Sequence, residues 1–180
     1  MSLQGKILIA EPFLGDKNFE RSVVLLCEHG PKGAFGLVLN QATNLKLDDV
    51  LDNIYGELPL YLGGPAWQST LHFIHRLGNE IEDTIDVGNG IFWSGDFEQI
   101  KTLINIGKIT ANDIRFFVGY SGWAEGQLEN EIKQDSWITT SIDTNLIFDT
   151  PSKNLWHEVL KRMGGQYKVL SNYPTDPRLN

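Results

Sequence analysis

The chain has 180 residues, of which 41% are apolar and 21% are charged, values typical of one globular domain spanning residues 1–180. Its 23 acidic residues against 15 basic ones give a net charge of −8, which disfavours binding to the phosphate backbone of nucleic acid. No apolar run approaches the roughly 20 residues of a membrane-spanning helix, so we expect no membrane partner.

The first half of the chain predicts strands joined by short turns. KILIA (6–10) is typical of a short strand. SVVLLCE (22–28) and AFGLVLN (34–40) are rich in β-forming residues, and the turn residues 29–33 between them predict an antiparallel hairpin. Because the run 23–27 is apolar on both faces, its strand is expected at the centre of a sheet.

Helices and strands are interspersed beyond residue 40. Residues 45–54 place apolar side chains at helical spacing, 96–106 begin with a capping pattern, and 151–165 have proline at the start and glycine at the end. A further helix is predicted at 124–133. Further strands are predicted within 59–65, 69–75, 90–95, 114–120 and 136–141. The pattern predicts an α+β fold: a single compact domain with a largely antiparallel or mixed sheet and helices packed on it.

The stretch GYSGW (119–123) lies between a buried run and the helix at 124–133, and it has three possible interpretations. A phosphate-binding loop needs Lys-Ser/Thr after its last glycine, but Gly126 is followed by Gln-Leu. No lysine or arginine lies between 116 and 132, so the phosphate interpretation fails. A nucleophile elbow and a tight strand-to-helix corner remain.

The nucleophile elbow would make the protein a small hydrolase that uses Ser121 with His157 and Asp143 or Asp149, an order that such enzymes share. However, the fifth position of the motif is Trp123 where an elbow has glycine, and His157 falls inside a predicted helix. We therefore favour a structural or ligand-facing corner, and we predict no catalytic residues.

Neither a metal site nor a cofactor site is predicted. His72 and His75 are three residues apart in a predicted strand, so their side chains point to opposite faces. Cys27 is the one cysteine, which excludes a zinc site built on cysteine pairs and favours a reducing, cytoplasmic compartment. We expect Cys27 to be a small core residue.

Three segments place glycine or a lone polar group where a hydrophobic strand ends, as functional loops on a rigid scaffold do. They are Asn40, on a strand face that Gly36 leaves open, the Gly-Gly-Pro at 63–65, and the corner at 119–123. We expect them to border one recognition surface, with Trp123 as an anchor that either packs the corner or offers an aromatic wall. The predicted binding residues are Asn40, Gly63, Gly64, Pro65, Gly119, Tyr120, Gly122, Trp123, and the helix residues Gln127 and Glu131.

Five motifs in series, covering nearly the whole chain, resemble the AlgH/YqgE family of small bacterial proteins. They are G-x-x-L-I-A-x-P (Gly5 to Pro12), F-x-R-S-V-V-L-L (Phe19 to Leu26), G-x-x-G-L-V-L-N (Gly33 to Asn40), Y-x-G-G-P (Tyr61 to Pro65) and G-Y-x-G-W-x-x-G-Q-L-E-x-E-I (Gly119 to Ile132). The resemblance implies a cytoplasmic, single-domain α+β protein of unknown function. The family commonly has alanine at position 121, so Ser121 argues against a shared hydroxyl-dependent reaction.

Two functional classes follow from these observations. One is a non-catalytic regulatory domain that binds a small ligand or a protein partner. The other is an enzyme, most plausibly the small hydrolase described above. Dense glycines and aromatic residues with few convergent titratable groups favour the binding domain.

Overall fold

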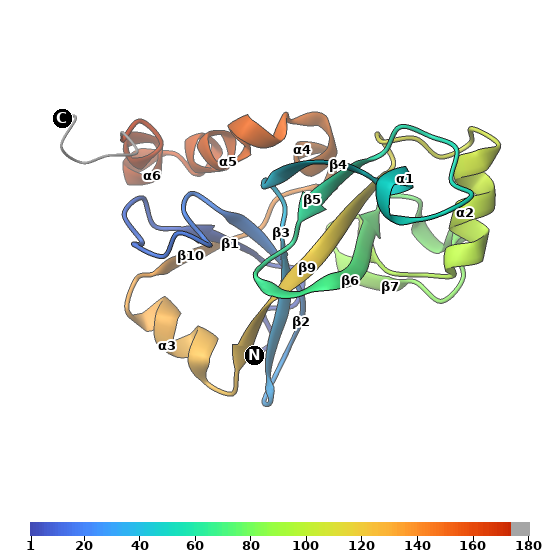
Figure 1. The fold of residues 1–180 in the computed structure, drawn as a ribbon. Coiled ribbons are helices and arrows are strands. Elements are labelled where there is room, and N and C mark those ends of the chain that lie inside the picture. The colour runs from blue at the N-terminus through green and yellow to red at the C-terminus, as the bar shows by residue number, and fades with distance from the viewer. Residues whose placement is uncertain (174–180) are drawn as a thin grey trace.

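The computed structural model describes residues 1–173, and Figure 1 shows the arrangement of its elements. Residues 174–180 of the predicted domain lie outside the described residues. The elements in chain order are β1 (Ile7–Ala10), β2 (Val23–Gly30), β3 (Gly33–Val38), β4 (Ala42–Lys46), α1 (Leu47–Val50), β5 (Pro59–Leu62), β6 (Ala66–His75), the 3₁₀ helix η1 (Gly78–Glu80), β7 (Ile85–Gly88), β8 (Ile91–Trp93), α2 (Phe97–Asn105), β9 (Ile114–Ala124), α3 (Gln127–Lys133), β10 (Trp137–Thr140), α4 (Thr144–Asp149), the 3₁₀ helix η2 (Ser152–Asn154), α5 (Leu155–Met163) and α6 (Gly165–Leu170).

Ten strands of the described chain form one sheet in the order β10-β1-β2-β3-β9-β6-β8-β7, with β5 beside β9 and β4 beside β5. The β5–β9 pair is parallel, and the other pairs are antiparallel. The predicted hairpin is confirmed, since β2 and β3 pair antiparallel through the turn at 31–32. The α+β fold with a largely antiparallel sheet is therefore confirmed.

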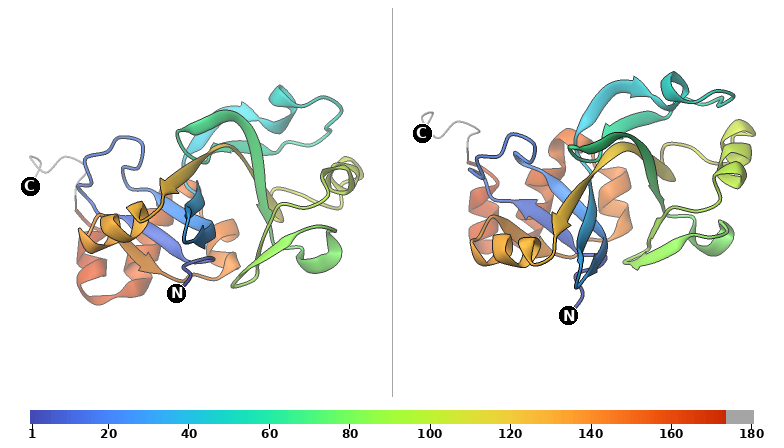
Figure 2. Two further views of the ribbon diagram at one scale, coloured as in Figure 1. Left: turned by 90° about the horizontal axis from the view of Figure 1, so that it is seen from below. Right: turned by 60° about the horizontal axis from the view of Figure 1, so that its bottom comes forward.

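The strand β9 joins the two halves of the sheet. Its first half pairs with β5 and β6, and its last four residues pair with β3. Figure 2 shows β9 running from the end that carries α2 toward α3. The sheet also curls, which brings the residue ahead of β1 close to β7 although these strands are far apart in the strand order. An added Cβ on Gly5 would lie 1.9 Å from the carbonyl oxygen of Val87 in β7.

Helices cover both faces of the sheet, which produces three hydrophobic clusters. The first lies between the curled sheet and α4–α6, the second between β5, β6, β9 and α2, and the third between β1–β3 and α3. In Figure 1 α5 and α6 lie above β1 and β10, and α3 lies below them. Cys27 is buried in the first cluster, where burial raises the pKa of its thiol, as expected of a core residue.

Three of the four predicted helices are present, with α3 lying within the predicted range 124–133, and one is not. Asp96 caps α2 by accepting a hydrogen bond from the Gln99 nitrogen at 3.3 Å, and α5 occupies most of 151–165. The predicted helix at 45–54 is wrong except for α1, because residues 42–46 pair as β4 with β5. Within residues 1–173 no helix is long and apolar enough to cross a membrane.

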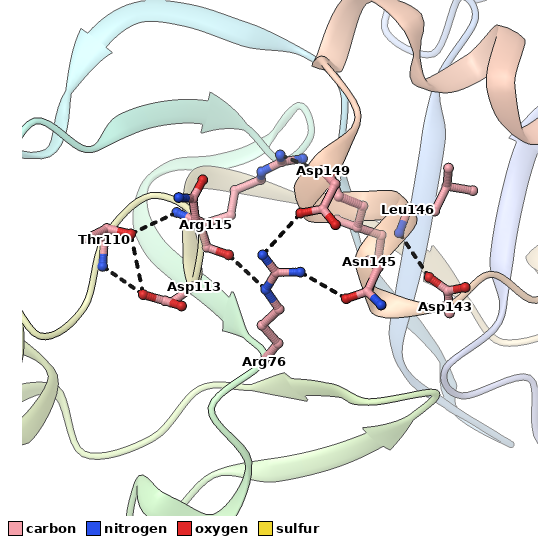
Figure 3. A network of polar contacts seen from close by, with 10 residues as sticks. Arg76, Thr110, Asp113, Arg115, Asp143, Asn145, Leu146 and Asp149 are labelled. Atoms are coloured by element: carbon pink, nitrogen blue, oxygen red, sulfur yellow. Dashed lines mark hydrogen bonds and ion pairs between the residues drawn. The ribbon is translucent and has the colours of Figure 1, made fainter.

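A buried arginine ties α4 to the sheet. Arg115 in β9 donates hydrogen bonds to the carbonyl oxygens of Leu39 (3.1 Å) and Ile147 (3.2 Å), and its guanidinium lies 4.5 Å from the Tyr61 ring centroid. Figure 3 shows Arg115 near Arg76, which lies on the same side of α4. These two hydrogen bonds of Arg115 hold the chain at Leu39, directly after β3, against α4.

Candidate functional site

The structure brings together the three segments that the sequence predicts to border one surface. The Val38 nitrogen donates to the Gly63 carbonyl oxygen at 2.9 Å and the Leu62 nitrogen donates to the Gln41 carbonyl oxygen at 2.8 Å, so the chain around Asn40 runs beside Leu62 and Gly63. The Gly63 nitrogen donates in turn to the Val118 carbonyl oxygen at 2.9 Å. The segment 63–65 is therefore sandwiched between the end of β3 and the middle of β9.

The backbone of Gly63 and Gly64 crosses β9 with no room for side chains. An added Cβ on Gly64 (φ +154°) would lie 2.2 Å from the Tyr120 carbonyl oxygen. One on Gly119 (φ +72°) would lie 2.6 Å from the Gly64 oxygen, and one on Gly63 would lie 2.5 Å from the Gly119 oxygen. Glycine alone fits such contacts and such φ angles. We call Gly63, Gly64 and Gly119 the glycine crossing.

The predicted strand-to-helix corner at 119–123 is wrong in its position. Residues 119–123 belong to β9, which continues to Ala124, and the turn into α3 occurs at 125–126. Strand pairing explains the difference, because Ser121 to Ala124 still pair with β3. Gly119 instead marks a bend within a strand, where another backbone approaches closely.

Asn40 has a structural role in this arrangement. Its Oδ1 accepts from the Val23 nitrogen at 3.0 Å and its Nδ2 donates to the Arg21 carbonyl oxygen at 2.9 Å. The space over Gly36 holds no pocket, because an added Cβ there would lie 3.3 Å from the Trp123 ring. A groove of about 330 Å³ lies beside Asn40 instead. Its other lining residues are Lys17, Asn18, Glu20, Arg21, Ser22 and Gln41.

Trp123, Gln127 and Glu131 interact with one another and hold α3 on the sheet. Glu131 Oε1 accepts from the indole nitrogens of Trp123 (3.2 Å) and Trp137 (3.0 Å), and its Oε2 accepts from Gln127 Nε2 (2.8 Å). Trp123 is only 6% exposed and packs against Phe19 and Trp137. We call Trp123, Gln127, Glu131 and Trp137 the indole–carboxylate network. In this placement Trp123 is a core residue.

Tyr120 and Gly122 lie on the face of β9 opposite to Trp123. Gly122 pairs with Phe35, and its missing side chain leaves room for the Tyr120 ring, which stacks on Phe35 at 4.7 Å. Phe35 also stacks on Trp93 at 5.2 Å, and His72 packs edge-on against Phe35 and Tyr120. All four side chains are half-buried. We call Phe35, His72, Trp93 and Tyr120 the aromatic rim.

The sequence analysis missed most of the aromatic rim. Its members come from β3, β9, β6 and β8, which are distant in the chain but are consecutive neighbours in the sheet. A sequence signal existed in the aromatic residues at strand positions 35, 72 and 93, but it does not predict that they meet. Burial lowers the pKa of His72 in this setting.

Trp67 is exposed beside the glycine crossing, and the sequence analysis missed it too. Its side chain is 71% exposed and its φ is +42°, a value rare for a residue with a side chain. Thr70 Oγ1 donates to the Trp67 carbonyl oxygen at 2.7 Å and lies 3.0 Å from His72 Nε2. The exposed Pro65 precedes this bend by two residues. A fixed backbone therefore presents a large apolar side chain to solvent next to the aromatic rim.

The residues of the hydrolase alternative do not form a catalytic array. Ser121 is fully buried and donates to the Gly63 carbonyl oxygen at 3.1 Å. His157 Nδ1 lies 2.5 Å from the Ser171 carbonyl oxygen, and its Nε2 lies 3.5 Å from Arg21 Nη1. The serine and the histidine thus each have other partners, and neither is positioned to activate the other.

The two candidate acids are also engaged elsewhere, as Figure 3 shows. Asp143 Oδ1 accepts from the Leu146 nitrogen at 3.0 Å and caps α4. Asp149 Oδ1 accepts from Arg76 Nη2 at 3.1 Å. Neither carboxylate orients His157, so the geometry offers no Ser-His-Asp relay.

His75 faces a different environment from His72, as their spacing predicts. His75 is buried, and its Nε2 lies 2.9 Å from Thr84 Oγ1 and 3.2 Å from the Ser94 carbonyl oxygen. Burial lowers the pKa of His75, although the Ser94 carbonyl opposes that effect. Among the residues that the structure describes, no group of three or more His, Cys, Asp or Glu side chains is arranged to hold a metal ion.

Comparisons with known proteins agree on one family. A family model described as AlgH-like matches residues 7–168. The chain is 50% identical to a UPF0301 protein of Cytophaga hutchinsonii over the whole of both chains. It is 41% identical to one of Chlorobium limicola, with 98% of this chain and 95% of the relative covered.

Two solved structures share the fold. The solution structure of the AlgH protein from Pseudomonas aeruginosa has a TM-score of 0.76 at 28% identity, covering 97% of this chain and 95% of that one. The crystal structure of protein DIP2367 from Corynebacterium diphtheriae has a TM-score of 0.78 at 24% identity, covering 94% and 91%.

Proposed function

This chain belongs to the AlgH-like family, and on that premise we propose that it is a non-catalytic regulatory protein that binds a partner protein. The binding surface consists of Trp67 together with the aromatic rim, next to the glycine crossing. The observation that carries the proposal is the 71% exposure of Trp67 on a backbone held at φ +42°.

An exposed tryptophan on a rigid support has the properties of an interface anchor. Tryptophan and tyrosine dominate the binding energy of protein interfaces, where a few large side chains become buried by the partner. Backbone strain of order 1–3 kcal/mol persists only where the surrounding structure fixes it. Here the Thr70 hydroxyl and the glycine crossing fix it, so the backbone that carries the indole is positioned before the partner arrives.

A partner protein accounts for this surface better than a small ligand does. Small ligands bind in concave sites that enclose most of their surface, whereas the Trp67 side chain is largely in solvent. His72 is the titratable group of the aromatic rim with a shifted pKa, and it pairs with the Thr70 hydroxyl. Because the Thr70 hydroxyl donates its proton to the Trp67 carbonyl oxygen, His72 does not activate it as a nucleophile, and this pair supports binding and not catalysis. We place this function in the cytoplasm, since Cys27 is an unpaired thiol.

Site-specific photo-crosslinking in the living bacterium tests this proposal. A photoreactive phenylalanine replaces Trp67 in one strain and Val169 in a control strain, because Val169 in α6 is comparably exposed at 58%. We expect a discrete covalent adduct from position 67 that is absent from position 169. The adduct should weaken when Tyr120 is also replaced by alanine. The same adducts from both positions, or none from position 67, would contradict the proposal.

A further inference from the structure

Four large apolar side chains are exposed on one edge of the molecule, on the segment from β4 to β5 and at the end of α2. Tyr55 is 70% exposed, Ile106 is 60% exposed, and Leu45 and Val50 are each 45% exposed. Figures 1 and 2 show that this segment lies beside α2, at the opposite end of the molecule from α3. Exposed apolar side chains that gather in one region often mark an interaction site, whereas single scattered ones do not.

The loop that carries Tyr55 is fixed to α2 by one side chain. Asn105 Oδ1 accepts from the Tyr55 nitrogen at 2.8 Å, and Asn105 Nδ2 donates to the Asn53 carbonyl oxygen at 2.9 Å. Asn53 itself has a φ of +60°, which turns the loop back toward α2. The two bonds place Tyr55 close to Ile106, the residue that follows Asn105. Tyr55 is thus an exposed aromatic side chain on a preorganised loop, which reduces the entropy lost on binding.

Exposed acidic residues are interspersed in the sequence with the apolar residues of this edge. Between residues 45 and 57 the chain has Asp48, Asp49, Asp52 and Glu57 against Lys46 alone. Lys46 Nζ lies 3.2 Å from Glu57 Oε1, so these two charges offset each other. No ion pair found within residues 1–173 involves the three aspartates. With Lys108, two residues beyond Ile106, also counted, four acidic residues stand against two lysines, so the net charge of this edge is −2.

We propose that this edge is a second interaction surface, which binds a basic amphipathic segment of a partner protein. The apolar side chains would contact the apolar face of that segment, with Tyr55 and Ile106 at the centre. The aspartates would face its lysines and arginines, and complementary charge would set its orientation. This surface is independent of Trp67 and the aromatic rim.

Fluorescence anisotropy with designed peptides tests the proposal on the intact protein. The probe is a labelled peptide of about 14 residues, roughly four helical turns, with leucine and lysine at amphipathic spacing. A second peptide has the same lysines but serine in place of leucine. Tyr55→Ser, Ile106→Ser and Asn105→Ala are compared with Val169→Ser and Ile85→Ser as exposed controls. Urea denaturation checks that each variant is folded.

The proposal predicts saturable binding of the leucine–lysine peptide, and much weaker binding of the serine–lysine peptide. Tyr55→Ser and Ile106→Ser should each weaken binding about tenfold, and the two control variants should bind like the wild type. Asn105→Ala keeps both apolar side chains but frees the loop, so it should weaken binding by a smaller factor. Asp52→Asn should reduce the salt dependence of binding. Equal binding of the two peptides, or wild-type affinity of Tyr55→Ser and Ile106→Ser, would overturn the proposal.

Discussion

Replacing Gly64 by alanine tests the glycine crossing. The new Cβ would lie 2.2 Å from the Tyr120 carbonyl oxygen and 2.4 Å from Ser121 Oγ, so the two backbones must separate by about 1 Å to reach a normal contact. A φ of +154° adds backbone strain of about 1–3 kcal/mol for alanine. Forced repacking adds about 1–3 kcal/mol. We therefore expect Gly64→Ala to lower the free energy of unfolding by about 2–6 kcal/mol.

Gly107→Ala is the matched control, because Gly107 also has a positive φ of +78° but an added Cβ there meets nothing within 4 Å. It should cost only the backbone strain, about 1–2 kcal/mol. Urea denaturation followed by circular dichroism gives the free energy of unfolding of both variants. In thermal unfolding of a chain of this size, Gly64→Ala should lower Tm by about 10 °C. If Gly64→Ala were no more destabilising than Gly107→Ala, the close backbone crossing would be refuted.

Three further predictions follow from the described contacts. Glu131→Gln replaces a carboxylate oxygen by an amide that cannot accept all three hydrogen bonds, so urea unfolding should show a loss of about 2 kcal/mol; the exposed Glu125→Gln should show almost none. Because burial lowers the pKa of His75, the unfolded chain takes up a proton first, and stability should fall as the pH drops below about 6.5. His75→Gln should flatten that dependence, and an unchanged slope between pH 7 and about 5 would contradict this assignment. Ser121 should not react with a fluorophosphonate probe, and Ser121→Ala should cost only about 1 kcal/mol, since the Gly63 carbonyl oxygen keeps its bond from the Val38 nitrogen.

The sequence predicts local structure well where local interactions decide it. The hairpin at 22–40 combines β-forming residues with a turn, and α2 begins at a capping aspartate, so both agree with the structure. The alternation along 35–39 also places Leu37 and Leu39 in one cluster and Val38 in another, as the pattern predicts. The predicted helix at 45–54 is wrong because strand pairing, a long-range interaction, outweighs helical spacing.

The candidate site was predicted only in part, for a physical reason. Glycines at the ends of hydrophobic runs correctly indicated that 63–65 and Gly119 lie together. Sequence patterns do not reveal which partner a side chain meets across the sheet. For that reason the sequence left open whether Trp123 packs the corner or faces a ligand, and Glu131 was expected as a polar contact, whereas both belong to the indole–carboxylate network. Trp67 was not expected at all.

The dissociation constant of the complex with the partner captured at position 67 tests the central claim most directly. Isothermal titration calorimetry compares the wild type with Trp67→Ser and Val169→Ser, with urea midpoints measured in parallel. Recognition through Trp67 predicts at least about tenfold weaker binding for Trp67→Ser, with an unchanged urea midpoint and wild-type affinity for Val169→Ser. Wild-type affinity of Trp67→Ser for that partner would contradict the claim.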